Sequence, residues 1–299
     1  MTSKGSADIQ LKCIICHGSD LKKMNGFKDA GLVRCPQCHF VFSEFIPDIL
    51  TLVAHYENYP RHHRTSPITL RRYEKLSDEL KSFATSGKWI DVGCGNGEML
   101  NHVKQRGWQV FGTEFTANAV DICKEKGISM QQGPLNVANY DPESFDVVTS
   151  IEVLEHINNP VEEIRNFHKL LRKGGALYLT TPNFNSISRH LLGPKWDIIS
   201  YPEHLCYYTT TSLNNLLTKN HFKKLFITTS GFNPARFAGS LNRSDSHIKK
   251  EQEASKTNSE NLRSLTEYNK AGALIKKSIN QILNLTGMGD TIKALYIKL

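Results

Sequence analysis

Residues 89–100, WIDVGCGNGEML, constrain the fold of this chain more than any other stretch. The apolar run at 89–92 is typical of a buried strand, and Gly93, Gly95 and Gly97 follow it at alternate positions. Because glycine has no Cβ atom, such a turn can bend sharply into a helix and lie against a ligand, and the first N–H groups of that helix are available to an anion. The segment therefore predicts a ligand site at the carboxyl end of a strand.

Strand-like and helical segments then alternate along the chain. The strand-like runs are 89–93, 109–115, 145–151 and 176–182, and helical stretches lie at 97–107 and 117–127. Another helix is expected to begin at Asn159-Pro160 and to end at Gly174-Gly175, with one apolar face formed by Val161, Ile164, Phe167 and Leu171. This alternation predicts an α/β fold with a doubly wound, mostly parallel sheet that binds its ligand at the carboxyl ends of the strands.

Four of the seven cysteines form two C-x2-C pairs, Cys13 with Cys16 and Cys35 with Cys38. Two such pairs can close a tetrahedral Zn2+ site with no open position, which makes the expected zinc structural. His17 and His39 follow the pairs as alternative ligands, but four thiolates suffice. The sequence between the pairs can form a short hairpin, and bound metal would supply much of the folding free energy of so small a module.

The spacing of the glycine turn distinguishes two kinds of nucleotide site. A nicotinamide dinucleotide site reads GxGxxG, whereas this turn reads D-x-G-x-G-x-G, with Asp91 two residues before the first glycine. DVGCGNG resembles the first motif of class I S-adenosylmethionine-dependent methyltransferases. The resemblance implies a Rossmann-like, seven-stranded sheet, with the glycine turn under the methionine part of the cofactor and Asp91 near its amino group. It also implies that Glu114 binds both ribose hydroxyls and that Phe115 flanks the adenine.

This resemblance covers roughly residues 85–235 and returns at GDTIKALYIKL, which looks like the family's last strand, antiparallel beside residues 225–232. FDVVTSIEVLEHINNP is similar to the fourth motif, and Glu152 within it is assigned to the cofactor site. The segment GPLN departs from the family, because proline stands where an acid often binds the adenine amino group. Adenine binding would then depend on backbone groups near Leu135 or on Asn136.

Two histidines are candidates for the base that the methyl acceptor requires, since methyl transfer is an in-line displacement that needs positioning and proton removal. His204 lies in YPEHLCY, a segment that resembles the YxEHxxY-like segment of bacterial sugar C-methyltransferases, which also carry a four-cysteine zinc module. The chain is too short for the further substrate domain of that family, so we favour the broader group of small-molecule O-methyltransferases. We assign catalytic roles to His204, Glu203 and His156; packing or capping is the alternative for His204, and a structural or cofactor contact for His156.

The charge distribution leaves a second substrate class open. The net charge is +8, and the basic excess lies in residues 1–88 (13 basic, 9 acidic) and 236–299 (11 basic, 6 acidic). Basic flanks suit an anionic acceptor or nucleic acid, or are simply a solvated surface. A zinc-ribbon ribosomal RNA methyltransferase is therefore one alternative, although TTPN at 180–183 differs from a base-methylating (N/D)PP(Y/F) motif. A non-catalytic zinc-bearing adaptor is the other, and the intact glycines and Glu114 argue against it.

The predicted organisation has five parts: a zinc ribbon at 1–50, a helical connector at 51–86, a methyltransferase core at 87–236, a mobile and helical insertion at 237–288, and the last core strand at 289–299. Within the insertion, residues 240–268 are polar, and a helix with apolar Leu274, Ile275, Ile279, Ile282 and Leu283 follows them. This insertion is either a lid over the acceptor or a peripheral helix on the sheet. We expect a cytoplasmic protein with no membrane span, because the chain has neither a long apolar run nor a signal-peptide core.

Overall fold

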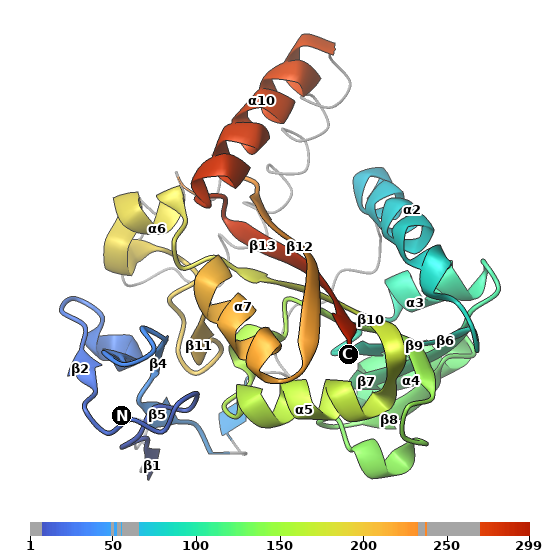
Figure 1. The fold of residues 1–299 in the computed structure, drawn as a ribbon, viewed down its shortest axis with the longest axis horizontal. Coiled ribbons are helices and arrows are strands. Elements are labelled where there is room, and N and C mark those ends of the chain that lie inside the picture. Colours follow the sequence, from blue (N-terminus) through green and yellow to red (C-terminus); the bar gives the residue numbers. More distant parts are fainter. Residues whose placement is uncertain (1–7, 49–50, 53–54, 56–65, 233–236, 238–269) are drawn as a thin grey trace.

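The structure is a computed structural model that describes residues 8–48, 51–52, 55, 66–232, 237 and 270–299. At its centre lies a seven-stranded sheet in the order β12-β13-β10-β9-β6-β7-β8 (Figure 1). Its strands are β6 (Lys88–Val92), β7 (Gln109–Glu114), β8 (Ser129–Gln132), β9 (Phe145–Ile151), β10 (Leu171–Pro182), β12 (Phe222–Ser230) and β13 (Thr291–Lys298). β13 is antiparallel to both β10 and β12, and the pairs β6–β7, β7–β8, β6–β9 and β9–β10 are parallel. The predicted mostly parallel α/β sheet and its antiparallel last strand are confirmed.

Helices cover both faces of this sheet, as doubly wound topology requires. On one face, α2 (Pro67–Leu80), α3 (Glu98–Lys104) and α4 (Ala117–Glu125) bury apolar side chains with Trp89 and Val147. On the other face, α5 (Pro160–Leu170) and α7 (Thr210–Lys219) pack against side chains such as Ile90 and Val148. Neighbouring residues of one strand point to opposite faces, which explains why the strands are apolar without alternation.

A second, four-stranded sheet joins the N-terminal region to the core in the order β11-β4-β3-β2. It contains β2 (Lys22–Lys23), β3 (Leu32–Arg34), β4 (Val41–Ser43) and β11 (Cys206–Tyr207). The hairpin expected between the cysteine pairs is present, since β2 and β3 are antiparallel. A two-stranded sheet of β1 (Asp8–Ile9) and β5 (Phe45–Ile46) lies beside it. Because β11 comes from residues far along the chain, this region is built into the core.

Short helices complete the described chain. They are α6 (Ile187–Leu192) and the 3-10 helices η1 (Lys28–Ala30), η2 (Lys81–Phe83), η3 (Val137–Asn139), η4 (Leu154–His156) and η5 (Gly193–Lys195). One predicted boundary was wrong: α5 ends at Leu170, and Gly174 and Gly175 lie within β10. The pairing of β10 with β9 shifts register between Leu171 and Ala176, so a bulge containing both glycines begins the strand where a helix end was expected.

The last helix, α10 (Lys270–Thr286), extends away from the sheet and returns the chain to β13 (Figure 1). Its C-terminal part is fixed to β12, because the Thr229 hydroxyl donates to the Leu283 carbonyl and the Asn280 side chain accepts from Gly231 N–H. Leu283 is buried, whereas Ile279 and Ile282 are 47% and 60% exposed, so only part of the predicted apolar face of this helix is buried. The side chains of Leu274 and Ile275, and the whole segment 240–268, lie outside the described residues. No helix in the described part of the chain is long and apolar enough to cross a membrane.

Candidate functional site

The three glycines in the turn after β6 have different surroundings: two are closely packed and one faces open space. All three have positive φ angles, 75° at Gly93, 55° at Gly95 and 71° at Gly97. A Cβ atom at Gly93 would lie 2.5 Å from Val153, and one at Gly97 would lie 2.7 Å from the Cys123 sulfur. At Gly95 a Cβ atom would meet nothing within 4 Å. Gly95 therefore presents bare backbone to the space where a ligand would lie, and the other two glycines permit close packing.

Because of this difference, we expect alanine substitutions at these glycines to lower the free energy of unfolding by unequal amounts. Gly97→Ala combines a left-handed backbone with a collision against Cys123, and we expect it to lower the free energy of unfolding by about 2–4 kcal/mol. Gly95→Ala has the backbone cost alone, about 1 kcal/mol. Urea denaturation of the two variants measures the difference. Equal costs would mean that the neighbours of Gly97 move aside and that its packing is not the constraint.

Glu114, the last residue of β7, points toward the glycine turn. One carboxylate oxygen accepts a hydrogen bond from the Gly95 N–H at 3.1 Å, and the other accepts from the N–H groups of Phe115 and Thr116 at 2.8 and 3.1 Å. These contacts fix the carboxylate at the carboxyl edge of the sheet, with Phe115 next to it. A carboxylate has about four lone-pair sites, so the same oxygens can also accept from vicinal hydroxyls.

Asp91 lies beneath the turn and is only 4% exposed. Its side chain accepts a hydrogen bond from the Thr149 hydroxyl of β9 at 2.6 Å. Burial, together with the nearby Glu114 charge, raises the pKa of Asp91 to about 7, although the bond from Thr149 opposes that shift. A buried carboxyl with this pKa is ready to ionise when a cationic group binds beside it. The sequence placed Asp91 here but gave no sign of Thr149.

The residues assigned to adenine follow β8, next to Glu114. The Gly133 N–H donates to the Glu114 carbonyl at 2.9 Å, which ties the end of β8 to the end of β7. Leu135 is half-buried and packs against the core cluster that contains Ile90. The Asn136 side chain accepts from the Ala138 N–H at 3.1 Å and so caps η3. Leu135 and Asn136 thus follow a strand end that is tied to Glu114, and the Asn136 side-chain oxygen is bonded within the η3 turn.

His156 and His204 form a pair, with ring centroids 4.8 Å apart at an angle of 70°. His156 Nδ1 lies 2.7 Å from the Glu203 carbonyl oxygen, and His204 Nδ1 lies 2.7 Å from the Ile198 carbonyl oxygen. A carbonyl can only accept, so in each ring Nδ1 carries a proton. Burial lowers the pKa of His156 to about 4, and the adjacent His204 adds to this effect.

Glu155 is a third member of this group that the sequence analysis missed. It is 2% exposed and accepts a hydrogen bond from the Thr181 hydroxyl at 2.9 Å. Burial and the charge of Glu152 raise its pKa well above the ordinary value. The side chains of Glu155, His156 and His204 each offer one polar atom, and these atoms lie within 4.8 Å of one another. In the sequence, its position directly before the candidate base His156 in LEHI could have pointed to Glu155.

The backbones of Glu203 and Glu152 both contact His156. Glu203 contacts His156 through its carbonyl oxygen, while its carboxylate lies 3.4 Å from the Ser200 hydroxyl and 3.8 Å from His55 Nε2. Glu152 directly follows β9 in a left-handed backbone conformation (φ 56°). Val153 comes next and packs against Gly93, so the glycine turn and the histidine pair are joined through one short loop.

A cavity lies next to this loop. Its lining combines three carboxyl side chains with apolar and aromatic groups: Glu152, Pro182, Ser188, Leu192, Trp196, Asp197, Ile198, Phe237, Asp290 and Thr291. Trp196 provides a large aromatic wall of this cavity. The cavity lies at the carboxyl ends of β9 and β10, which is the edge at which open α/β sheets bind their ligands.

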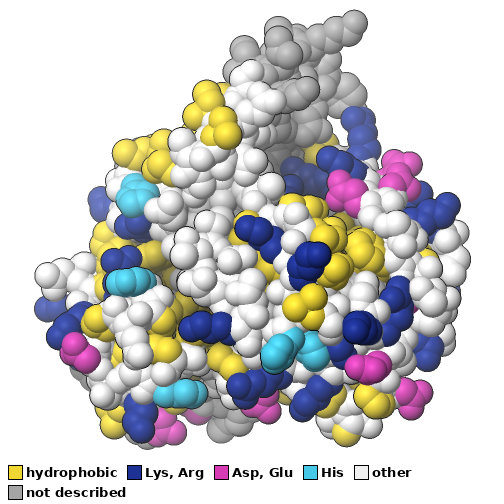
Figure 2. Space-filling model, in the orientation of Figure 1, with side chains coloured by type: hydrophobic (Ala, Val, Ile, Leu, Met, Phe, Trp, Pro, Cys, Tyr) yellow, Lys and Arg dark blue, Asp and Glu magenta, His cyan; other side chains and the backbone are white. Residues whose placement is uncertain are grey.

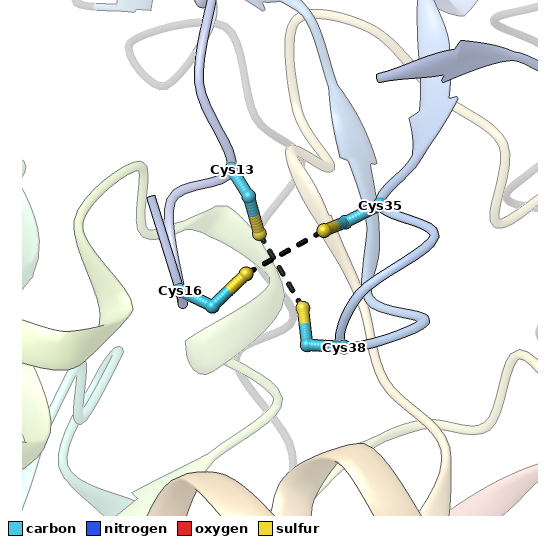
Figure 3. Close-up of side chains that lie close together, drawn as sticks. All are labelled: Cys13, Cys16, Cys35 and Cys38. Carbon is cyan, nitrogen blue, oxygen red and sulfur yellow. Dashed lines mark hydrogen bonds between the residues drawn. The ribbon is translucent and has the colours of Figure 1, made fainter. Parts of the chain in front are cut away.

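The four N-terminal cysteines gather at one point. Figure 3 shows their sulfurs pointing toward one another, with 3.4 Å between Cys13 and Cys38 and 3.5 Å between Cys16 and Cys35. Zinc–sulfur bonds of about 2.3 Å in a tetrahedron require sulfurs about 3.8 Å apart, so this cluster fits the metal closely. His17 and His39 end the two turns at left-handed positions, and neither belongs to the ligand group found among the described residues.

The distribution of basic side chains on the surface bears on whether the substrate is a nucleic acid. On the face drawn in Figure 2, Lys and Arg side chains are scattered among acidic and apolar ones and do not form one band.

Asn183, the last residue of the TTPN segment at 180–183, is fully buried, and its side chain donates hydrogen bonds to the carbonyls of Gly287 and Gly289. This segment therefore joins the end of β10 to the turn before β13.

Comparisons with known proteins identify relatives of the core. Residues 61–225, more than half of the chain, match a family described as a methyltransferase domain. A ubiquinone biosynthesis O-methyltransferase of Idiomarina loihiensis is 31% identical over 138 residues, which cover 44% of this chain and 55% of that protein. One of Pseudomonas aeruginosa is 33% identical over 105 residues, covering 33% and 45%. The chain thus spans about half the length of the curated relatives it matches.

A solved structure from Galdieria sulphuraria, described as a candidate sarcosine dimethylglycine methyltransferase, has a TM-score of 0.51 and 15% identity, and the match covers 77% of this chain and 85% of that one. At this level of identity, the likeness shows a common fold.

Proposed function

The chain belongs to the methyltransferase-domain family, and from this premise we propose that it transfers the methyl group of S-adenosylmethionine to a hydroxyl of a small-molecule acceptor. The observation that carries the proposal is the arrangement at Gly95. Its backbone faces open space, its N–H is bonded to the Glu114 carboxylate, and the adjacent Gly93 packs on the loop that leads to the histidine pair.

When bound, the cofactor supplies an electrophilic methyl group on a sulfonium. In our proposal the bare backbone at Gly95 lies against the methionine part, and Glu114 holds the ribose hydroxyls. Asp91 faces the cationic end, and Phe115 with Leu135 and Asn136 bounds the adenine. Gly93, Gly97 and Glu152 complete the site by shaping the turn and the loop beside it. The donor set suits the ligand, because it offers carboxylates to a molecule with positive charge and vicinal hydroxyls.

The pKa of Asp91 predicts how cofactor affinity depends on pH. A cation beside the carboxyl lowers its pKa from about 7, so binding below pH 7 must release a proton. Affinity is therefore expected to rise by up to about tenfold per pH unit as the pH approaches 7, and to level off above it. Titration calorimetry in buffers of different ionisation enthalpy measures both the affinity and the released proton. Asp91→Asn should flatten the profile, and an unchanged profile in that variant would assign the proton to another group.

We propose that His204 is the base that takes the proton from the acceptor hydroxyl. Its Nδ1–H is fixed on the Ile198 carbonyl, which sets the orientation of the imidazole ring. The pKa of His156 is lowered by burial, and we give it and Glu203 the task of positioning His204 and its segment. The cavity beside Glu152 is the proposed acceptor site, where carboxyl groups can accept hydrogen bonds from hydroxyls and Trp196 offers an apolar wall. Ile198, whose carbonyl holds the His204 ring, is one of its lining residues, whereas His204 itself is buried beside it and is not among them.

Hydroxyl acceptors are favoured by the relatives, whose names describe O-methylation. A sugar, a lipid-linked molecule or a secondary metabolite would each provide the hydroxyl. A test offers a catechol, a nucleotide sugar and total RNA in parallel, with the methyl-labelled cofactor, and measures label in each product. Transfer to either small acceptor supports the proposal. Label only in RNA would support the nucleic-acid alternative instead, and cofactor binding without transfer to any acceptor in this set would count against hydroxyl methylation of these classes.

We also propose that Cys13, Cys16, Cys35 and Cys38 hold a structural Zn2+ ion, as the sulfur separations support. The five-part division given above, with a ribbon at 1–50 and a core at 87–236, is our domain proposal, in which the insertion at 237–288 is either a lid over the acceptor or a peripheral helix. The RNA alternative gains no support from the scattered basic side chains in Figure 2 or from the buried Asn183. The adaptor alternative is disfavoured by the intact arrangement of Gly95 and Glu114.

A further inference from the structure

The segment that carries His204 is held by the N-terminal region through main-chain hydrogen bonds. β11 begins two residues after His204 and pairs antiparallel with β4, with Cys206 opposite Phe42 and Tyr207 opposite Val41. The Ser43 N–H also donates to the Leu205 carbonyl at 2.8 Å. The segment is therefore an added strand of the N-terminal sheet as well as a part of the candidate site.

The opposite side of this segment contacts the loop after β9. The Leu205 N–H donates to the Glu155 carbonyl at 2.8 Å, and the Cys206 thiol donates to the Ile157 carbonyl at 3.1 Å. His156 bonds the Glu203 carbonyl. Residues 203–207 thus lie between β4 and the loop that carries His156, and the position of His204 depends on both.

A short path connects β4 to the cysteine cluster. Cys35 and Cys38 form one turn, and the Cys35 N–H donates to the Phe40 carbonyl at 3.0 Å, immediately before β4. The Phe40 ring is buried and lies 5.2 Å from the ring of Tyr208, which follows β11. β2, β3 and β4 have only two or three residues each, so their hydrogen bonds alone give the sheet little stability.

We propose that the metal held by the four cysteines positions His204, by fixing β4 as the template on which residues 205–207 pair. This inference rests on the proposed function, because it assigns the N-terminal region a task in that reaction. The metal has no open coordination position with four thiolate ligands, so its contribution is the placement of β4 and of the base. Phe42 and Ser43 are accordingly positioning residues.

The first experiment removes the metal from the full-length protein with a chelator and restores it with zinc. Hydrogen exchange is followed in peptides that cover residues 203–208 and, as an internal reference, the glycine turn at 93–97. We expect exchange at 203–208 to accelerate by at least about tenfold without metal and to recover with zinc, while the glycine turn stays protected. Calorimetry should show cofactor affinity within about twofold of that of the zinc-loaded protein. Unchanged exchange at 203–208 after verified loss of the metal would overturn the proposal.

The second experiment breaks the pairing and keeps the cysteines. Ser43→Pro removes the N–H that binds the Leu205 carbonyl, and Asp20→Asn, at an exposed ion pair with Lys22 in the same region, is the control. Ser43→Pro should bind one equivalent of zinc, lose protection at 203–208, and lower kcat by at least about tenfold with little change in cofactor affinity. It should also shift the pH profile of kcat, which a general loss of folded protein would not do. A Ser43→Pro protein with parental kcat, exchange and pH profile would overturn the proposal.

Failure of the inference and failure of the proposed function are distinguishable. If metal removal exposes residues 203–208 but kcat and its pH profile are unchanged, the mechanical link stands and the assignment of His204 as base fails. If the exchange is unaffected and His204 variants are inactive, the base assignment stands and the positioning role of the metal fails. Should Ser43→Pro not fold, the chelation experiment decides between these outcomes alone.

Discussion

Replacing His204 by Gln is expected to lower kcat by roughly 10²–10⁴-fold, while the affinity for S-adenosylmethionine stays within about twofold. The Nδ1–H of His204 is bonded to the Ile198 carbonyl, which orients the ring, and in our proposal Nε2 is the atom that takes the proton of the acceptor. A glutamine side chain fills similar space but cannot accept a proton near neutral pH. Initial-rate kinetics with a saturating cofactor, together with calorimetry, separate the two effects.

The control for this experiment is His221→Asn. His221 is an exposed histidine with a left-handed backbone (φ 63°), a conformation that asparagine tolerates, and it lies on the loop before β12. This variant should retain parental kcat. Full activity of His204→Gln would remove His204 as the base, and a parallel loss of cofactor affinity would show that the substitution disturbs the site as a whole.

His156 provides a comparison within the pair. Its lowered pKa, about 4, means that it is neutral at physiological pH and a poor proton acceptor there. In our proposal His156→Gln acts through the Glu203 carbonyl and the position of the His204 segment, so its loss of kcat should be smaller than that of His204→Gln. If His156→Gln lost more kcat than His204→Gln, His156 would be assigned as the base and His204 as the positioning residue.

Replacing Glu114 by Ala is expected to weaken S-adenosylmethionine binding by roughly 100-fold, because charge-assisted hydrogen bonds to two hydroxyls contribute about 1.5–3 kcal/mol each and are partly replaced by water. The same carboxylate accepts hydrogen bonds from the Gly95, Phe115 and Thr116 N–H groups, so part of the loss comes from a less ordered glycine turn. Isothermal calorimetry gives the affinity directly.

Two further variants separate these contributions. Glu114→Gln keeps the shape and one good acceptor, and we expect an intermediate loss of about tenfold. Glu125→Ala, an exposed acid at the end of α4, changes net charge in the same way and should leave the affinity unchanged. If Glu114→Ala bound the cofactor as tightly as the parent protein, Glu114 would have no part in the site, and the assignment of the glycine turn to this cofactor would fail with it.

Local patterns predicted the core of this protein because short-range physics decides those features. The run 145–151 became β9 with the predicted bounds, because its Phe, Val and Ile residues suit a parallel strand that is covered on both faces. The glycine turn was found because positive φ angles at alternate positions leave few alternatives to glycine. The two C-x2-C pairs predicted the cysteine cluster for a similar reason, because two thiols on one tight turn point the same way.

Features formed between distant segments could not be predicted in the same way. The end of α5 was misplaced because the bulge containing Gly174 and Gly175 depends on the register between β10 and β9, which neither strand specifies alone. Glu155 was missed because its significance comes from burial against Thr181, 26 residues away. Its sequence neighbours carry no sign of that contact.

The sequence by itself determined which chemistry the chain can hold: a bare turn for a ligand, a carboxylate at Glu114, two histidines and four thiols. Only the tertiary structure decided that β4, near the cysteines, pairs with β11, next to His204. The physical reason is that backbone N–H and C=O groups are the same in every residue, so strand pairing between residues 41–43 and 205–207 leaves little trace in side-chain patterns.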